Sequence, residues 1–287
     1  METGAAYTPG SVTSADGTVI GYRKLGSDGP ALILLSGGYL AAQHYMELAR
    51  ELSRAFTVYV PDRRGRGRSG PPGPDYRMAR ECEDVEALVA ATGARLLFGH
   101  SSGGLIALQA SLALPAIDKI AVYEPALSMY GAFSMSWIPR FERELDQGRL
   151  AAAMVTFSKG VRANRTTDLV PRRLLVPLID MYLRRQAKPA RPDEQPLSEL
   201  IPLQRMDVQI FQEMSTSKGF AALTAQTLLM EGGKTPPPLH RALDALQATL
   251  AQTQRITFSG VGHEAPIDER GAAARVAAAS RAFFARS

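Results

Sequence analysis

A serine lies at a predicted sharp turn between a strand and a helix, in the sequence Gly99-His100-Ser101-Ser102-Gly103. The short apolar run at 96–98 is typical of a buried strand, and an apolar helical pattern at 105–114 follows at once. The two glycines make room for a strained backbone around the serine, where larger side chains would collide. The pattern predicts a strand, a sharp turn and a helix, with Ser101 at the apex of the turn.

This G-x-S-x-G sequence between a strand and a helix resembles the nucleophile elbow of the α/β-hydrolases. A glycine-rich turn can also join a strand to a helix for structural reasons alone, so the rest of the chain has to support the resemblance. The resemblance implies that Ser101 is a nucleophile and that the backbone N–H of Ser102 points at the substrate oxyanion. It also implies a mostly parallel eight-stranded sheet with helices on both faces and an inserted α-helical cap.

The order of the remaining patterns agrees with an α/β fold. Short apolar runs alternate with amphipathic helical patterns, which predicts a mostly parallel sheet covered by helices. Asp16-Gly17 is a hairpin signal between two strands within 11–25. Further strands are expected at 31–35, 56–60, 119–124, 226–233 and 255–259, and helices at 46–52, 76–92, after 236–238 and at 266–284.

The stretch 126–220 breaks this alternation, because helical patterns follow one another there at 137–147, 149–159, 171–186 and 198–214. The resemblance places a cap at this position. We therefore expect a hydrolase core formed by 1–125 and 221–287 and a cap formed by 126–220. The cap is rich in methionine and aromatic residues, most of which should form its own core while a few line an apolar pocket over Ser101. These residues are Met129, Tyr130, Phe133, Met135, Trp137, Phe141, Met154, Phe157, Met181, Tyr182, Met206, Phe211 and Met214.

Composition narrows the class of protein. The chain has 287 residues, 45% of them hydrophobic and 21% charged, which is typical of a globular protein. It contains no run of 18 apolar residues, and no basic segment followed by an apolar core at its start. Cys82 is the only cysteine, which excludes an intramolecular disulfide. We therefore expect a cytoplasmic monomer or homodimer that has no membrane partner.

The net charge of +5 is unevenly distributed. Residues 137–191 hold twelve Lys or Arg and five Asp or Glu, so this stretch is basic while the remainder is slightly acidic. Such a segment can attract an anionic partner, although solvated helix faces are the simpler interpretation. No nucleic-acid motif is present. The expected partner is a small-molecule substrate, with no nucleic acid, no cofactor and no metal.

Other residues match the family's catalytic pattern. His263 lies in the glycine-rich loop 260–264 after the last predicted strand, where the family places its general base, and imidazole suits that role because its pKa is near 7. His44, His100 and His240 have weaker cases. The family often carries H-G-x in its oxyanion loop, and this chain has Ser36-Gly37-Gly38. By that match Gly38 supplies the second N–H of the oxyanion hole, with Tyr39 as the alternative.

The loop 62–70 also matches a family pattern, D-x-R-G-x-G-x-S, whose role is mainly structural. We therefore interpret Asp62 and the arginines of this loop as loop architecture and not as catalytic groups.

The acid of the triad departs from the common pattern. Members often read G-x-x-D after the next-to-last strand, but this chain has Gly232-Gly233-Lys234-Thr235, and threonine cannot hold a negative charge against imidazolium. Three carboxylates remain: Glu124, Glu231 and Asp268. Glu124 follows the strand that a right-handed crossover places beside the elbow strand, and some relatives, including haloalkane dehalogenases, carry their acid there. We predict Glu124 as the acid, Glu231 at the rim of its own strand, and Asp268 as a cap of the last helix.

The resemblance implies metal-free hydrolysis of an ester, thioester or lactone of a small hydrophobic substrate through an acyl-enzyme on Ser101. Serine at the elbow argues against haloalkane dehalogenase and epoxide hydrolase activity, which use aspartate there in the family. Carbon–carbon bond hydrolysis and perhydrolase activity stay open. A ligand-binding or non-hydrolytic relative is also open, because fold does not fix function.

Overall fold

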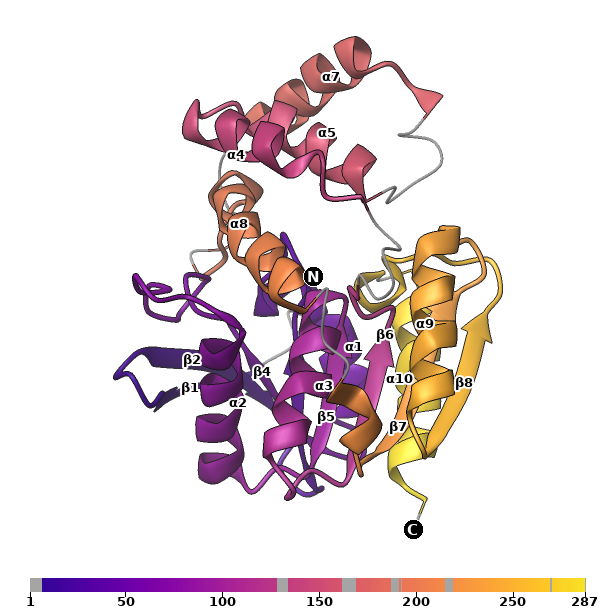
Figure 1. The fold of residues 1–287 in the computed structure, drawn as a ribbon. Helices are drawn as coiled ribbons and strands as arrows, with labels where there is room; N and C mark the ends of the chain where they lie inside the picture. The colour runs from indigo at the N-terminus through magenta and orange to yellow at the C-terminus, as the bar shows by residue number, and fades with distance from the viewer. Residues whose placement is uncertain are drawn as a thin grey trace.

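The computed structural model describes residues 7–127, 134–161, 169–186, 191, 193–214, 219–268 and 270–286. Met129, Tyr130 and Phe133, which we expected in the cap, lie outside these residues. The described chain forms one eight-stranded sheet flanked by helices, with further helices above one edge of the sheet (Figure 1). The strands are β1 Thr8–Thr13, β2 Val19–Leu25, β3 Ala31–Leu35, β4 Thr57–Pro61, β5 Leu96–His100, β6 Lys119–Tyr123, β7 Gln226–Gly232 and β8 Thr253–Phe258.

The strand order is β1-β2-β4-β3-β5-β6-β7-β8. β1 and β2, and β2 and β4, pair antiparallel, and every other neighbouring pair is parallel. β5 therefore lies inside the sheet with β3 on one side and β6 on the other. Because parallel strands end at the same edge, the residues that follow β3, β5 and β6 come together there.

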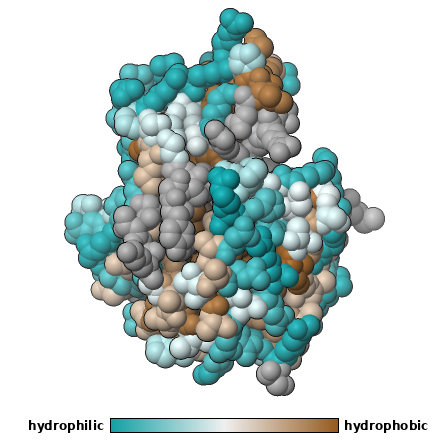
Figure 2. Space-filling view, turned by 45° about the vertical axis from the view of Figure 1, so that its right-hand side comes forward, coloured by the Kyte–Doolittle hydropathy of each residue, from teal (hydrophilic) through white to brown (hydrophobic). Residues whose placement is uncertain are grey.

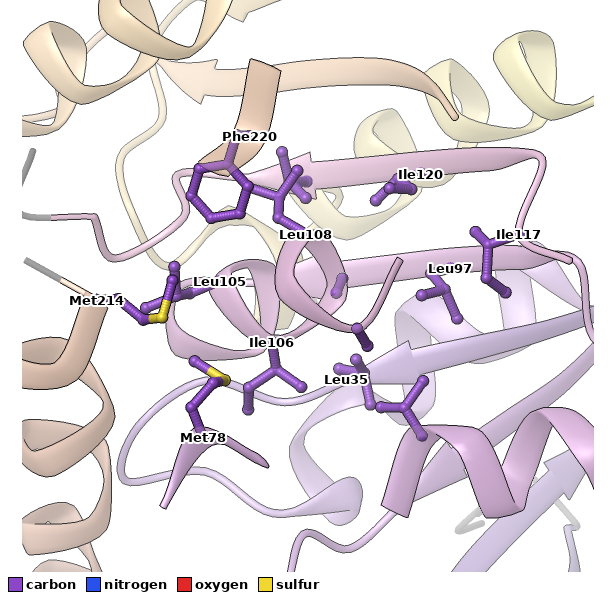
Figure 3. Packing of buried hydrophobic residues seen from close by; sticks show 14 of the residues in the cluster. Leu35, Met78, Leu97, Leu105, Ile106, Leu108, Ile117, Ile120, Met214 and Phe220 are labelled. Atoms are coloured by element: carbon purple, nitrogen blue, oxygen red, sulfur yellow. The ribbon is translucent and has the colours of Figure 1, made fainter. Parts of the chain in front are cut away.

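Helices cover both faces of the sheet. α2 (Met78–Thr92), α3 (Ser102–Ala113) and α9 (Pro237–Thr249) lie on one face, and α1 (Met46–Leu52) and α10 (Ala272–Phe284) lie on the other (Figure 1). β3 is apolar throughout because both of its faces are covered. Ile33 and Leu35 join the core under α3, and Leu32 and Leu34 join the core under α1 and α10. Figure 3 shows the first of these cores.

Two expected boundaries are corrected by turn residues. The terminal helix predicted at 266–284 starts only at Ala272, because Gly271 lies in the left-handed region (φ 109°) after a short 3₁₀ turn, η4, at Ala265–Ile267. His44, expected in the first α-helix, lies in the 3₁₀ turn η1 at Ala42–Tyr45 that precedes it.

The predicted cap segment is helical where it is described. It contains α4 (Ile138–Asp146), α5 (Leu150–Gly160), α7 (Arg172–Arg185) and α8 (Leu197–Met214). These helices share a hydrophobic cluster that includes Phe141, Ala153, Leu183 and Ile201. α8 also contributes Met206, Ile210 and Met214 to the core under α3, so it lies between the other cap helices and the sheet (Figure 1). The division of the chain into a hydrolase core (1–125 and 221–287) and a cap (126–220) stays a prediction.

Hydrophobic side chains remain at the surface of α7. Leu174, Leu178, Met181 and Tyr182 are each 45% or more exposed. Figure 2 shows hydrophobic residues at the top of the molecule, the region that α7 occupies in Figure 1. Among the described residues no helix is both long and apolar enough to cross a membrane.

Candidate active site

The turn after β5 has the strained geometry that its sequence predicts. Ser101 adopts φ 54° and ψ −120°, a conformation that non-glycine residues rarely take. A Cβ atom on Gly99 would lie 2.4 Å from the carbonyl oxygen of Gly103, and one on Gly103 would lie 2.3 Å from that of Leu35. Both glycines are therefore required for the elbow to pack between β5, α3 and β3.

The elbow is tied to the end of β6. The N–H of Ser101 donates to the carbonyl of Tyr123 (3.0 Å), and the carbonyl of Ser101 accepts from the N–H of Ala126 (3.0 Å). Glu124 lies between these two contacts. Its backbone is also left-handed, with φ 44°, and its side chain is fully buried. The strained serine and the strained glutamate are thus held against each other at one edge of the sheet.

Glu124 and His263 are in direct contact. Oε2 of Glu124 lies 2.7 Å from Nδ1 of His263, whose side chain is about one-third exposed (32%). Oε1 accepts hydrogen bonds from the N–H of Gly232 (2.7 Å) and from the hydroxyl of Thr235. The carboxylate therefore has partners on both oxygens, as a buried charge requires.

The other two carboxylates lie in different surroundings. Glu231 is buried and accepts hydrogen bonds from Arg255 (2.8 Å) and Thr257 (2.7 Å), and it lies 2.5 Å from His240. Burial opposes its charge, but the hydrogen bonds from Arg255 and Thr257 outweigh burial and lower its pKa.

Asp268 does not occupy the N-cap of α10 as we expected, because Gly271 holds that position. Its side chain accepts from the N–H of Arg270 (2.8 Å) in the loop before the helix.

His100 connects two loops of the site. Its Nε2 lies 2.9 Å from the backbone carbonyl of His263, and its Nδ1 lies 2.7 Å from the hydroxyl of Tyr45. Burial, followed by the nearby charge of His263, lowers the pKa of His100 well below its usual range, so the ring is neutral. A carbonyl can only accept, so Nε2 carries the hydrogen and Nδ1 accepts from Tyr45. The Tyr45 hydroxyl in turn accepts from the N–H of Gly37 (2.9 Å).

The loop after β3 is held by a second set of contacts. Nη1 of Arg66 donates to the carbonyls of Gly37 (2.7 Å) and Leu40 (2.8 Å), which bracket Gly38 and Tyr39. A Cβ atom on Gly38 would lie 2.4 Å from Oε1 of Gln204, so a larger residue there would displace the end of this side chain. Within the described residues, the N–H of Gly38 has no hydrogen-bond acceptor.

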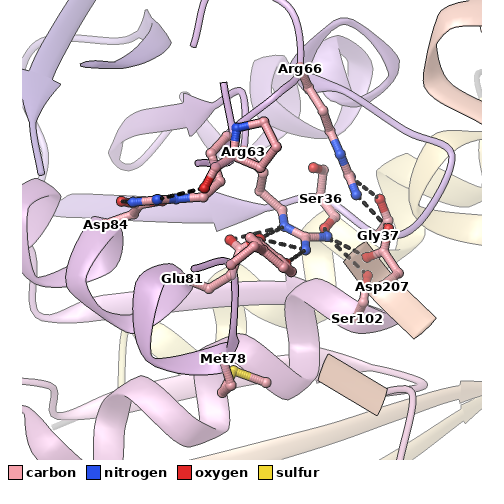
Figure 4. Close-up of polar contacts among 12 residues, drawn as sticks. Ser36, Gly37, Arg63, Arg66, Met78, Glu81, Asp84, Ser102 and Asp207 are labelled. Atoms are coloured by element: carbon pink, nitrogen blue, oxygen red, sulfur yellow. Dashed lines mark hydrogen bonds and ion pairs between the residues drawn. The ribbon is translucent and has the colours of Figure 1, made fainter. Parts of the chain in front are cut away.

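Arg66 belongs to a buried cluster of charges that reaches the elbow (Figure 4). Asp207, from α8, binds Arg63 (2.6 Å) and Arg66 (2.5 Å) through different oxygens. Arg63 also binds Glu81 (2.7 Å) and donates to the hydroxyl of Ser102 (3.1 Å). Burial opposes the charge on Asp207, but the two guanidinium groups outweigh it and lower the pKa of this carboxyl. Two cations and two anions therefore balance inside the fold.

The loop that carries these arginines is structural in the way we predicted. Asp62 is buried and accepts from the N–H groups of Ala42 (2.9 Å) and Arg68 (3.1 Å). The sequence did not predict that Arg63 reaches the elbow and that Arg66 reaches the loop after β3. Asp207 was also not identified from the sequence as a residue of the site. A carboxylate between the apolar residues Met206 and Val208 of a helical pattern was the signal that could have revealed it.

A cavity of about 240 Å³ brings the predicted site residues together. Its lining includes Gly38, Ser101, Ser102 and His263, whereas Glu124 is not part of the lining and lies behind His263. The remaining lining is mostly apolar: Tyr39, Ala126, Trp137, Met154, Phe157, Ser158, Val161, Gln204, Asp207, Val208, Phe211 and Leu239.

Phe141, one of the aromatic residues of the predicted cap, does not line the cavity; it is fully buried and packs on Trp137 and Phe157. No group of three His, Cys, Asp or Glu residues in the described part of the chain is arranged to hold a metal ion.

A model of the alpha/beta hydrolase family matches residues 32–279 of the chain. This chain belongs to the alpha/beta hydrolase family. Among solved structures, an alpha/beta hydrolase from Sphaerobacter thermophilus DSM 20745 is similar, with a TM-score of 0.74 and 26% identity over 96% of this chain and 100% of that one. An esterase from Rhodococcus sp. ECU1013 shares the fold, with a TM-score of 0.66 and 19% identity over 96% of this chain and 98% of that one.

Curated members of the family match parts of the chain. N-formylmaleamate deformylase of Pseudomonas putida is 33% identical over 128 residues, which are 43% of this chain and 48% of that protein. Non-heme chloroperoxidase of Streptomyces lividans is 37% identical over 99 residues, 33% of this chain and 36% of that protein. The matches thus span less than half the length of either relative.

Proposed function

We propose that this chain is a serine hydrolase that cleaves an ester, thioester or lactone of a small hydrophobic substrate through an acyl-enzyme on Ser101. The proposal rests chiefly on the contact between His263 and the buried Glu124, because this histidine lines the same cavity as the strained Ser101. A histidine that is oriented by a carboxylate and placed in one cavity with an elbow serine is the arrangement that acyl transfer requires.

In this mechanism Ser101 attacks the substrate carbonyl while His263 takes its proton through Nε2 and returns it to the leaving group. Glu124 keeps the hydrogen of the neutral ring on Nδ1 and stabilises the imidazolium that forms. The bonds from Gly232 and Thr235 keep Glu124 in place. Water then attacks the acyl-enzyme by the same route and regenerates Ser101.

The oxyanion in this proposal is bound by the N–H groups of Gly38 and Ser102. Ser102 is the first residue of α3, and the first N–H groups of a helix have no partner within the helix. The peptide between Gly37 and Gly38 is trans, so its C=O and N–H point in opposite directions. Because Arg66 binds the Gly37 carbonyl, the Gly38 N–H is directed away from Arg66 and is available to a ligand.

The substrate class is proposed from the cavity. Its volume is below the roughly 300–1,000 Å³ of typical ligand pockets, and its lining is mainly aromatic and aliphatic. Both features suit a small hydrophobic acyl or alcohol group. One family member with a partial match is named pimeloyl-[acyl-carrier protein] methyl ester esterase, from Stenotrophomonas maltophilia, with 33% identity over 94 residues, 33% of this chain and 35% of that protein.

The test combines labelling with turnover. A fluorophosphonate probe should label the native chain, and p-nitrophenyl esters of two to eight acyl carbons should be hydrolysed. Ser101→Ala should abolish labelling and lower kcat by up to about 10⁶-fold. Ser102→Ala is the matched control and should remain active, because the proposed reaction uses only the backbone N–H of Ser102, although the variant loses the hydrogen bond from Arg63. An active Ser101→Ala protein beside an inactive Ser102→Ala protein would refute the assignment of Ser101.

A native chain that binds esters but is not labelled and shows no turnover would point instead to the non-hydrolytic alternative.

A further inference from the structure

Among the described residues, seven buried side-chain N or O atoms have no hydrogen-bond partner, and three of the seven belong to residues that line the cavity. These three are Oη of Tyr39, Nε1 of Trp137 and Oε1 of Gln204. A buried polar atom that has lost water without gaining a partner destabilises the folded chain. Native proteins leave few such atoms, so three around one small cavity indicate a place where a ligand supplies the partners.

The three atoms differ in what they require. Nε1 of Trp137 can only donate a hydrogen bond, and Oε1 of Gln204 can only accept one. The Tyr39 hydroxyl can do either, because burial, with the nearby charge of Asp207, raises its pKa well above the usual range and keeps it protonated. A ligand group that satisfies all three must both accept and donate.

The charges around the cavity favour an uncharged group. Asp207 lines the cavity, but its two oxygens bind Arg63 and Arg66. Glu81 offsets the second positive charge of this cluster. Among the described lining residues no arginine or lysine is present to pair with a carboxylate. A charged ligand group would therefore be buried without a counter-ion, which is costly.

The positions of the three residues locate the group. Phe157 packs edge-on against both Tyr39 (5.2 Å between ring centroids) and Trp137 (5.4 Å), so the two rings flank it. Gln204 packs against Gly38, whose N–H we assign to the oxyanion hole. Gln204 thus lies beside the assigned oxyanion hole, while Tyr39 and Trp137 share their contact with Phe157 within a mostly apolar lining.

We propose that the preferred substrate carries, near its scissile carbonyl, a neutral group that both donates and accepts hydrogen bonds, a hydroxyl in the simplest case, bound by Tyr39, Trp137 and Gln204. This inference rests on the proposed hydrolase function for its catalytic part. Binding of the polar group can be measured without turnover, so the proposed binding site and the proposed hydrolase function can be tested separately.

Binding is measured on the Ser101→Ala protein. Trp137 is the only tryptophan of the chain, so intrinsic tryptophan fluorescence reports directly on one of the three atoms. The probes are methyl 3-hydroxybutyrate and methyl 3-methylbutyrate, which differ by a hydroxyl in place of a methyl group. Methyl 6-hydroxyhexanoate and methyl heptanoate form a second pair with the hydroxyl farther away.

The hydroxyl ester should bind about 3- to 10-fold more tightly than its methyl partner in at least the first pair, and it should shift the emission to longer wavelength. Tyr39→Phe and Gln204→Met should each reduce this preference several-fold. Phe157→Leu, which alters the cavity without removing a polar atom, is the matched control and should leave the preference in place.

Equal or tighter binding of methyl 3-methylbutyrate than of methyl 3-hydroxybutyrate would overturn the inference, as would a preference that neither Tyr39→Phe nor Gln204→Met changes. In the native chain, the ratio of kcat/KM for the p-nitrophenyl esters of the same acids should follow the binding preference and should fall in Trp137→Phe. If hydroxyl esters bind as expected but no ester is hydrolysed and Ser101 is not labelled, the proposed function fails while the binding site stands.

Discussion

The hydroxyl of Thr235 donates a hydrogen bond to Oε1 of Glu124, while Oε2 of the same carboxylate lies 2.7 Å from Nδ1 of His263. Thr235 occupies the position at which family members often carry the acid. In this chain the carboxylate that contacts His263 comes from the neighbouring strand end, and the residue at the usual position donates a hydrogen bond to it. Because Thr235 binds Glu124 directly, we expect the effect of a substitution at one of these residues to depend on the residue at the other position.

Glu124→Gln should lower kcat by about 10³- to 10⁴-fold, because the amide retains the shape of the side chain but cannot stabilise the imidazolium of His263. Glu231→Gln is the matched control. It should keep kcat close to the native value while lowering the melting temperature, because Glu231 is buried against Arg255 and His240. Ester kinetics and thermal melts separate the two effects. Near-native activity of Glu124→Gln beside an inactive Glu231→Gln would refute the assignment.

Thr235→Asp should have opposite effects in two backgrounds. In the native chain it places a second carboxylate beside the buried Glu124, and repulsion between like charges should lower both activity and stability. In the Glu124→Gln background it supplies the missing charge within hydrogen-bonding distance of residue 124, and part of kcat should return. The measurement is kcat for the four proteins of this double-mutant cycle. Additive losses would show that position 235 is out of reach of His263.

Arg66→Lys should lower kcat by about 10- to 100-fold with a smaller change in KM, because a single ammonium cannot hold the carbonyls of Gly37 and Leu40 while also binding Asp207. The Gly38 N–H would then lose its aim at the oxyanion, which matters most in the transition state. Arg68→Lys is the matched control in the same loop, since only the backbone N–H of Arg68 binds Asp62. Equal kinetics for the two variants would contradict this role of Arg66.

His100 should make the protein less stable in mild acid. Its pKa is lowered in the folded chain and is about 6.5 in the unfolded chain, so the unfolded state binds the additional proton. The free energy of unfolding should therefore decrease as the pH falls below about 6.5. In His100→Gln this part of the decrease should be absent, which thermal melts between about pH 8 and pH 5 can measure. His44, whose pKa burial also lowers, contributes in the same direction in both proteins. Parallel curves would contradict the prediction.

Trp137→Ala and Phe141→Ala should have different consequences although the two rings touch. Trp137 lines the cavity, so its loss should change the relative kcat/KM of p-nitrophenyl esters with short and long acyl chains. Phe141 is fully buried in the hydrophobic cluster of α4, α5, α7 and α8, so its loss should cost about 3–5 kcal/mol of stability and leave chain-length preference unchanged. A changed preference in Phe141→Ala at a temperature where it is folded would contradict this distinction.

Much of the fold was accessible from local patterns. Most strand and helix bounds agree with the expected ones within two residues, because each is marked by apolar periodicity and by turn residues such as Asp16-Gly17. The elbow was equally local, since Gly99 and Gly103 lie within two residues of Ser101. The predicted terminal helix begins too early in the sequence, because Gly271 was not recognised as the residue before its first turn.

The supporting contacts of the site could not be read in the same way. Asp207 meets Arg63 across 144 positions of sequence, and His100 meets the carbonyl of His263 across 163. No spacing rule connects residues so far apart, and only the folded sheet brings them together. The contact of Glu124 with His263 is an exception, because the crossover rule for parallel strands limits which carboxylates can reach that edge.

The place of Asp207 on α8 determines where this chain can be recombined with its relatives. A chimera that takes the whole of 126–220 from a hydrolase without a carboxylate at the position of Asp207 removes the counter-ion of Arg63 and Arg66, and leaves two buried cations with Glu81 alone. A chimera that exchanges only 126–196 retains α8 and with it the balanced charges beneath the elbow. A junction just before Leu197, inside the cap and not at its border, thus keeps this charge cluster intact.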